Sequence, residues 1–462
     1  MRRRKFLSLA AMGSIAGIRQ ARACVQEPAL SMVLTGGKYF DGTKWINGPL
    51  GITREGTQVL LKAIPDGAKL MDVTGKIISP GFIDILADNA SNPDRTYRIF
   101  EKYKVSDGVT TALQMHGGSE QVASYYARFS TLPHHINFGV STFVMRIRNA
   151  YPEMKDRLRV VEKSLEAGAL GVSHSIEYQP TPYAEVIQYA RLAKKYDRPF
   201  FLHLRYSSEL QELEGVDEAI RLARETGVRL HIDHLHSTGG TFRMAEALAK
   251  IRTANASGSQ ITCCVYPYSY WATYLHSKRF DEKWRERYGL DYSDLRLVGT
   301  GERLTAASFA HYRKEMRLVA VPEGTMPMNK TIDLALKESF CMIGSDGGIE
   351  SEPRANSHPR GAGCFATGIR HGLDIGMKPE EILAKVTTLP AALISPAMKG
   401  RGAIAAGNIA DLVVFDPNTI NGRASVENPN QFSAGISMVL VNGKVAYRDG
   451  VLAEAAGKPI RY

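Results

Sequence analysis

Short apolar segments alternate with amphipathic segments of helical periodicity over residues 80–399. The apolar segments include PFFLHL at 199–204 and ITCCVYPY at 261–268, and the amphipathic ones include YAEVIQYARLAKKY at 183–196 and GVDEAIRLARETG at 215–227. Repeated strand and helix units of this length form parallel sheets, because two neighbouring parallel strands need a crossover helix between them. We therefore predict an α/β fold, a closed (β/α)8 TIM-like barrel that spans this part of the chain.

Both ends of the chain have a different pattern. Residues 24–79 and 400–462 contain short alternating apolar runs that are separated by Gly, Asp and Asn, as in MVLTGGKYFDG at 32–42 and NIADLVVFDPNTI at 408–420. This pattern is typical of short strands joined by turns. We predict one small β-sandwich domain built from both ends. Within the barrel, residues 276–335 are rich in charged and aromatic side chains, and we expect a surface helix or a lid over the barrel mouth.

Residues 1–23 have the features of an export signal. A basic start that contains Arg3 and Arg4 precedes a short apolar core, and Ala21-Arg22-Ala23 matches a cleavage site. The arginine pair resembles a twin-arginine signal, which predicts a periplasmic or exported protein, while an ordinary secretory signal or a basic tail is the alternative. A lipid anchor at Cys24 is a further alternative. The apolar core is too short for a stable membrane span.

The net charge of +11 does not indicate nucleic-acid binding. Six of the positive charges lie before residue 24, so about +5 remains over the rest of the chain, without a concentrated basic run. The hydrophobic fraction of 44% and the charged fraction of 23% are those of a globular protein. Oligomeric state cannot be derived from the sequence.

Three histidines follow predicted barrel strands. His203 ends PFFLHL, His234 follows RLHI one strand–helix unit later, and His116 ends GVTTALQMH. Side chains at the carboxyl ends of barrel strands converge at one mouth, and imidazole nitrogens suit zinc. We predict that these three histidines bind a metal, although each one alone is also consistent with an ordinary polar or loop position.

Asp346 follows another apolar strand and precedes a glycine turn in IGSDGG. A carboxylate there can bind a metal or act as general base on a metal-activated water, whose pKa falls to about 7. The alternative is a turn-forming aspartate.

Motifs along almost the whole chain resemble the amidohydrolase superfamily, in its branch of D-aminoacylases, or N-acyl-D-amino-acid deacylases. They are SPGFID at 79–84, GVTT at 108–111, LEAGALGVSHSIEYQP at 165–180, LHLR at 202–205, IDHLH at 232–236, VYPY at 265–268, IGSDGG at 343–348, HPRGAG at 358–363, TTLPAALI at 387–394 and GRGAIAAGNIADLVVFDPNTI at 400–420. Their number and order carry the resemblance.

The resemblance implies a barrel with a small β-sandwich, and a zinc-activated water that attacks the amide of an N-acyl amino acid. It also implies that His203 and His234 hold the tighter zinc ion and that Asp346 moves the proton. Substrate contacts are implied for Tyr266, Tyr268 and Arg360, since a guanidinium binds a carboxylate through two donors. The implied partner is a small molecule, in the simplest case one with a carboxylate.

Several positions depart from the family pattern. Where relatives have His-x-His after GFID, this chain has Leu86 and Asp88, and where they have a bridging cysteine it has His116 followed by glycine. We therefore expect one zinc ion per chain. Three further side chains are candidates for additional metal ligands: Glu177, His174 and Asp88. His236 stands where many relatives have a lysine near the substrate.

Three functional classes are consistent with the sequence. The first is an exported zinc hydrolase acting on the amide of an N-acyl (D-)amino acid or a related small amide or peptide. The second is an enzyme of the same fold with non-hydrolytic chemistry, such as cyclisation, elimination or isomerisation of a modified amino acid or peptide. The third is an inactive relative that binds a small acid.

Overall fold

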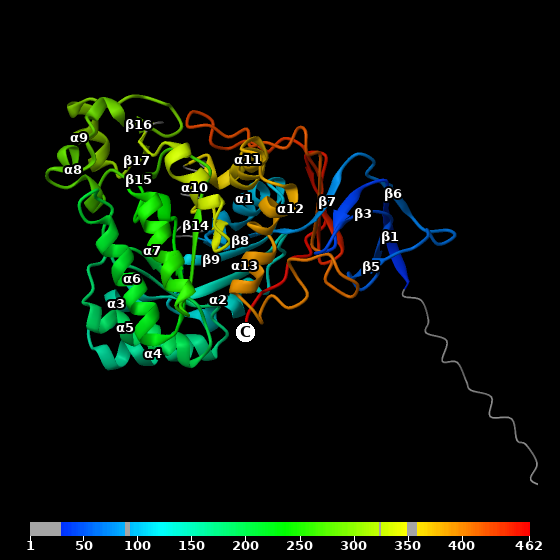
Figure 1. Cartoon of the computed structure of the whole chain (residues 1–462), viewed down its shortest axis with the longest axis horizontal. Helices are drawn as coiled ribbons and strands as arrows, with labels where there is room; N and C mark the ends of the chain where they lie inside the picture. Colours follow the sequence, from blue (N-terminus) through cyan, green and yellow to red (C-terminus); the bar gives the residue numbers. More distant parts are fainter. Residues whose placement is uncertain (1–28, 88–92, 323–324, 349–357) are drawn as a thin grey trace, which may run out of the picture.

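The computed structural model describes residues 29–87, 93–322, 325–348 and 358–462. It shows an α/β chain with a barrel and with β-sheets contributed by both chain ends, which confirms the predicted fold class (Figure 1). The predicted export signal and Asp88 lie outside the described residues. The predicted domain boundaries remain predictions.

Eight parallel strands form the barrel sheet of the described chain. They pair in the order β18, β14, β13, β12, β11, β10, β9, β8. Their bounds are β8 Phe82–Asp84, β9 Val109–Ser119, β10 Asn137–Phe143, β11 Val172–Ser175, β12 Phe200–His203, β13 Arg229–Ile232, β14 Gln260–Val265 and β18 Cys341–Ile343. Because all eight run in one direction, their carboxyl ends gather at one mouth of the barrel.

The last gap in the barrel lies between β18 and β8. The backbone at residues 385 and 386 bridges it: Ile343 N donates to the carbonyl of Lys385 at 3.2 Å, and Ile83 N donates to that of Val386 at 2.8 Å. At the mouth end the carboxylate of Asp84 accepts from Ser345 N at 3.0 Å. Hydrogen bonds from a loop and a side chain thus take the place of direct strand pairing between β18 and β8, at the seam of the barrel.

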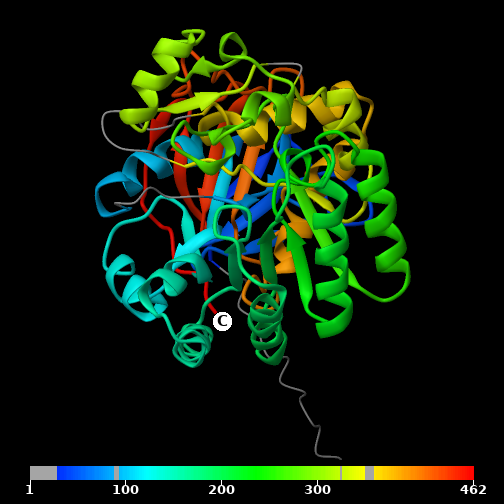
Figure 2. The same ribbon diagram turned by 90° about the vertical axis from the view of Figure 1, so that its left-hand side faces the viewer.

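The helices cover the outside of the barrel (Figures 1 and 2). Their apolar stripes face the strands, which is the usual cause of helix amphipathicity in such a layer. Their bounds are α1 Pro93–Ser106, α2 Val122–Phe129, α3 Val144–Ala150, α4 Met154–Glu166, α5 Tyr183–Lys195, α6 Glu212–Thr226, α7 Met244–Ala256, α10 Ile332–Leu336, α11 Arg360–Asp374, α12 Pro379–Ala384 and α13 Thr388–Leu393, with 3₁₀ turns η1 Leu235–Ser237 and η4 Met328–Lys330.

The two chain ends share a pair of sheets. One sheet has the order β5, β4, β1, β6, and the other β22, β21, β20, β19, β7, β2, β3. Figure 1 shows the N-terminal strands in blue beside the C-terminal ones in red. A common apolar core joins Leu34 and Leu50 to Leu412 and Leu440. The bounds are β1 Leu30–Thr35, β2 Lys38–Phe40, β3 Trp45–Asn47, β4 Leu50–Thr53, β5 Gln58–Leu60, β6 Leu70–Asp72, β7 Ile77–Pro80, β19 Leu412–Phe415, β20 Ile436–Val441, β21 Lys444–Arg448 and β22 Val451–Leu452.

An insertion after β14 forms a small layer of its own, in the part of the chain predicted as a surface helix or lid. Its short strands pair in the order β15, β17, β16, and helices pack beside them in the upper part of Figure 1. The bounds are β15 Ala272–Tyr274, η2 Lys278–Phe280, α8 Trp284–Tyr288, η3 Tyr292–Asp294, β16 Arg296–Leu297, α9 Ala306–Lys314 and β17 Leu318–Ala320. Within the described ranges, no helix combines the length and apolarity that a bilayer crossing needs.

Candidate metal and catalytic site

Three histidines meet at the barrel mouth. His116 lies in β9, His203 ends β12, and His234 follows β13 by two residues. Among the described residues they form a group in which one ring nitrogen of each lies within 4.8 Å of the others. The Nδ1 of His203 is 3.2 Å from the Nε2 of His234. Two nitrogens bound to one tetrahedral zinc ion at about 2.0–2.1 Å lie about 3.3 Å apart, so the donor set fits such an ion.

Each histidine also contacts an oxygen on its other side. The Nδ1 of His116 lies 2.8 Å from the Oδ2 of the buried Asp233. The Nε2 of His203 lies 2.8 Å from the Oε2 of Glu177, and the Nδ1 of His234 lies 3.0 Å from the Oγ of Ser237. Oxygen partners of this kind fix the ring orientation of metal-binding histidines and raise their basicity.

Burial favours the neutral form of His203 and His234. It lowers the pKa of His203 to about 4, against the opposing effect of Glu177, and it lowers the pKa of His234 well below the usual value, with positive neighbours adding to the effect. Burial also raises the pKa of Asp233 to about 6, although His116 works in the other direction. Neutral imidazole is the form that binds metals, so the site is prepared for an ion near pH 7.

Asp346 lies beside the histidines on the turn after β18. Its Oδ2 is 3.9 Å from the Nε2 of His234 and 3.0 Å from the Nη2 of Arg360. Asp346 has a φ of 47° and His234 has a φ of 29°. Residues other than glycine rarely adopt this left-handed backbone conformation, and such strained residues cluster at functional sites. The carboxylate is thus held at the edge of the histidine group.

A buried polar face continues from Arg360. The edge of the Tyr266 ring contacts His236 with a centroid distance of 4.1 Å, and the guanidinium of Arg360 lies 4.7 Å from the centre of the same ring. Tyr268 stacks edge-on against His358, which lies two residues before Arg360. Both ring nitrogens of His236 and the Nε and Nη1 of Arg360 are buried and have no hydrogen-bond partner among the described residues. Burial lowers the pKa of His236 to about 3, so this side chain is neutral.

Of the additional ligands considered from the sequence, Glu177 lies at the histidine group and His174 does not. His174 is not brought to the histidine group: its Nε2 lies 2.8 Å from the Oγ1 of Thr181, and its ring faces Tyr189 on α5. Glu177 does reach the group, through His203. Leu86 is fully buried in the apolar interior of the barrel with Met115 among its neighbours in the cluster. The first strand therefore offers no donor at that position.

Sequence reasoning missed three groups that shape the site. Asp233 and Ser237 flank His234 closely in the sequence, and a search for oxygen donors next to the predicted ligands would have found them. Arg279 lies in η2 of the insertion and contacts Glu177, which is 102 residues earlier in the chain. No local sequence pattern marks Arg279 as a site residue. Only the folded chain brings it to the barrel mouth.

The family of the chain follows from comparison with known sequences. A sequence model described as the amidohydrolase family matches residues 96–446. The chain therefore belongs to the amidohydrolase family, and it is a hydrolase of carbon–nitrogen bonds other than peptide bonds.

Two curated relatives from Alcaligenes xylosoxydans xylosoxydans place it near one branch. N-acyl-D-glutamate deacylase is 28% identical over 94% of this chain and 96% of its own length, and D-aminoacylase is 28% identical over 90% and 94%. These relatives confirm the resemblance to the D-aminoacylase branch.

Solved structures share the fold. N-acyl-D-glutamate deacylase from Bordetella bronchiseptica, complexed with zinc and a phosphonate inhibitor, superposes with a TM-score of 0.80 at 24% identity, over 94% of this chain and 100% of that one. A D-aminoacylase structure superposes with a TM-score of 0.77 at 24% identity, with the same coverage.

Proposed function

We propose that this protein is a zinc-dependent deacylase that hydrolyses the amide bond of an N-acyl amino acid, with D-amino acids as the first class to test. The observation that carries the proposal is the group of three converging histidines beside the Asp346–Arg360 pair. The deacylase relatives support the reaction type.

His116, His203 and His234 would hold the ion. A zinc ion supplies Lewis-acid chemistry at such a site, because it lowers the pKa of a water ligand and polarises an amide carbonyl. We propose one ion per chain, since the buried Leu86 provides no donor where a second ion would need one. Three protein nitrogens leave a fourth position of a tetrahedral ion open, as in catalytic zinc sites.

Asp346 is the group that moves the proton. Its carboxylate accepts a proton from the attacking water and delivers it to the leaving amide nitrogen, the two halves of general acid–base catalysis. The Nη2 of Arg360 lies 3.0 Å from the Oδ2 of Asp346 and forms an ion pair with it. This ion pair fixes the carboxylate at the edge of the histidine group, where a substrate amide would lie.

The face formed by Arg360, His236 and Tyr266 would bind the carboxylate end of the substrate. Within the described part of the chain, the buried Nε and Nη1 of the guanidinium have no acceptor, and the neutral imidazole of His236 can donate one hydrogen bond and accept one. Buried donors without partners favour a ligand that supplies acceptors. A carboxylate does so with two oxygens.

The first experiment is metal analysis of the purified protein after exhaustive dialysis. We expect about one zinc ion per chain, and loss of that ion in His203→Ala. His174→Ala is the matched control, because this buried histidine is bound to Thr181 and should leave the zinc content unchanged. Absence of any bound metal in the wild type would overturn the zinc mechanism.

The second experiment tests the reaction. Wild-type protein with zinc is incubated with N-acetyl-D- and N-acetyl-L-amino acids, and the free amine is measured. We expect release from the D series and a loss of about 10²–10⁴-fold in kcat for Asp346→Asn. A product that keeps the amide bond would instead support cyclisation, elimination or isomerisation.

We also propose that the chain is exported. The composition of residues 1–23 supports a twin-arginine-type signal. Fusion of these residues to a reporter that is active only after folded export would test it, with Arg3 and Arg4 replaced by lysine as the control. Export that survives this replacement would contradict the twin-arginine route.

A further inference from the structure

Arg279 of the insertion reaches the histidine group and is buried there. Its Nη2 lies 2.9 Å and its Nε 3.2 Å from the Oε2 of Glu177. The same Nη2 donates to the carbonyl of Ser237 at 3.1 Å. The guanidinium also lies 5.0 Å from the centre of the Trp271 ring. One arginine thus contacts the partners of two different histidines.

These contacts form a closed ring of five residues. Arg279 binds Glu177, which contacts the Nε2 of His203, and the Nδ1 of His203 faces the Nε2 of His234. The Nδ1 of His234 then contacts Ser237, whose carbonyl returns to Arg279. The two nitrogens that would share the ion are therefore part of a ring that the insertion completes.

The ring also assigns the protons of both imidazoles. A carboxylate only accepts, so the Nε2 of His203 carries the proton toward Glu177 and the lone pair is on Nδ1. The hydroxyl of Ser237 has one proton and lies 3.0 Å from both the carbonyl and the Nδ1 of His234; we assign the proton to the carbonyl, so that the hydroxyl oxygen accepts from the Nδ1 of His234. The lone pair of His234 is then on Nε2. These two lone-pair nitrogens are the ones that lie 3.2 Å apart.

We propose that Arg279 is a positioning residue through which the insertion sets the metal affinity of the barrel site, with the ion bound by Nδ1 of His203 and Nε2 of His234. Arg279 does not touch the ion; it fixes Glu177 and the backbone of Ser237, and these two fix the histidines. The inference rests on the proposed zinc site.

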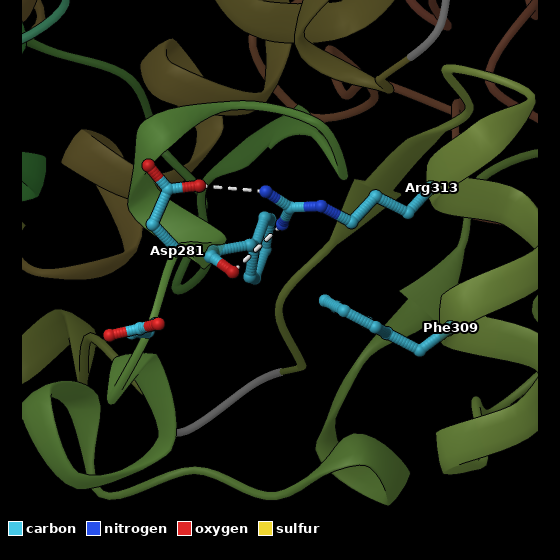
Figure 3. A pocket seen from close by; sticks show the side chains of 5 residues that line it. Asp281, Phe309 and Arg313 are labelled. Atoms are coloured by element: carbon cyan, nitrogen blue, oxygen red, sulfur yellow. Dashed lines mark hydrogen bonds and ion pairs between the residues drawn. The ribbon is translucent and has the colours of Figure 1, made fainter.

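Other residues of the insertion hold the segment that carries Arg279. Arg313 of α9 donates to the carbonyls of Leu275 and Phe280, each at 2.8 Å, and to the Oδ1 of Asp281 at 2.7 Å. Figure 3 shows this guanidinium directed at the turn that follows Arg279, beside a cavity of about 580 Å³. Helix α9 therefore anchors η2, and η2 presents Arg279 to the barrel.

The test is a double-mutant cycle on zinc affinity. The dissociation constant is measured by competition with a chromophoric chelator for wild type, Arg279→Met, Glu177→Gln and the double variant. We expect Arg279→Met to weaken binding about 10–100-fold, as for other side chains that orient metal ligands. In the Glu177→Gln background the same replacement should have a clearly smaller effect, because coupled residues are not additive. Equal effects in both backgrounds would overturn the proposal.

Arg285→Met is the matched control. Arg285 lies in α8 of the same insertion and pairs with the exposed Asp291, so its loss should leave zinc affinity unchanged. Thermal unfolding followed by circular dichroism checks that each variant folds. If Arg279→Met does not fold, Arg279→Lys replaces it, and an affinity equal to that of wild type would count against the two-pronged contact.

Two spectroscopic readouts separate positioning from general stability. The visible spectrum of the Co²⁺-substituted protein should change in Arg279→Met at saturating metal, because the histidine ligands reorient. In ¹⁵N-histidine-labelled wild type, nitrogen shifts should identify Nδ1 as the metal-bound atom of His203. Binding through Nε2 would contradict the inference. Wild type that binds no zinc would overturn this inference and the proposed function together, whereas unchanged affinity in Arg279→Met would overturn this inference alone.

Discussion

Replacement of Lys104 by methionine should destabilise the barrel at its seam. Lys104 extends from α1, and its Nζ lies 2.7 Å from the Oδ2 of Asp84 and 2.8 Å from the Oγ of Ser345. The two charged side chains are 1% and 0% exposed. The Oδ1 of Asp84 also accepts from Leu86 N at 3.1 Å and from Ser345 N at 3.0 Å. Lys104 and Asp84 both contact Ser345, so the ion pair joins the first barrel strand to the turn after the last one.

The expected cost follows from these contacts. Removal of one partner of a buried pair leaves an uncompensated charge, which typically costs about 3–5 kcal/mol. Asp84 keeps three other donors, which are Leu86 N, Ser345 N and the hydroxyl of Ser345, so we expect about 3 kcal/mol. Adding Asp84→Asn should recover at least about 1 kcal/mol, because the amide removes the charge. Its oxygen can keep both backbone donors, and its NH₂ group can donate to Ser345.

The assay is urea denaturation followed by circular dichroism. Lys250→Met is the matched control: Lys250 pairs with Asp217 at 2.8 Å, but the two side chains are 38% and 55% exposed. Solvent screens that pair, so its loss should change the free energy of unfolding by less than about 1 kcal/mol. A Lys104→Met effect as small as that of the control, or a double variant no more stable than Lys104→Met, would refute the argument.

Three further replacements test other parts of the framework. Asp107→Ala removes the carboxylate that accepts from two backbone N–H groups of α11, just after the non-helical Gly363; each buried donor left without a partner costs about 1–3 kcal/mol, and urea denaturation should show the sum. Gly118→Ala should destabilise the protein and lower its zinc content, because the added Cβ would lie 2.4 Å from the carbonyl oxygen of Ser141 at a φ of +109°; normal zinc content and stability would contradict this. Glu212→Ala should expose the loop at residues 241–243 to limited proteolysis, since this buried carboxylate accepts its three backbone N–H groups, and an unchanged cleavage pattern would show that the loop is held by other contacts.

The barrel was predictable because its pattern is local. The amphipathic segment at 183–196 became α5, Tyr183–Lys195, and the apolar segment at 199–204 became β12, Phe200–His203. Each element buries one face on its immediate neighbours, so its periodicity is present in the sequence. The insertion was less predictable: its sheet begins at Ala272, before the expected boundary at 276, and its strands have only two or three residues.

The candidate site divides in the same way. Strand-end positions brought His116, His203 and His234 into one predicted group, because every parallel strand ends at the same mouth. His174 shows the limit of that rule: it lies one residue before the end of β11, but side chains alternate between the faces of a strand, and its ring faces α5. Register within a strand of four residues was not fixed by the pattern.

The sequence by itself determined the fold class, the branch of the amidohydrolase family and which histidines meet. The tertiary structure decided how these histidines are held. It set which ring nitrogen faces the other histidines, and it placed Asp233 against His116 and Glu177 against His203. It also brought Arg279 from a distant insertion into contact with Glu177. The physical reason is range. Periodic burial acts between neighbours in the chain, whereas a hydrogen bond depends on positions to within a few tenths of an ångström, which only the packed molecule sets.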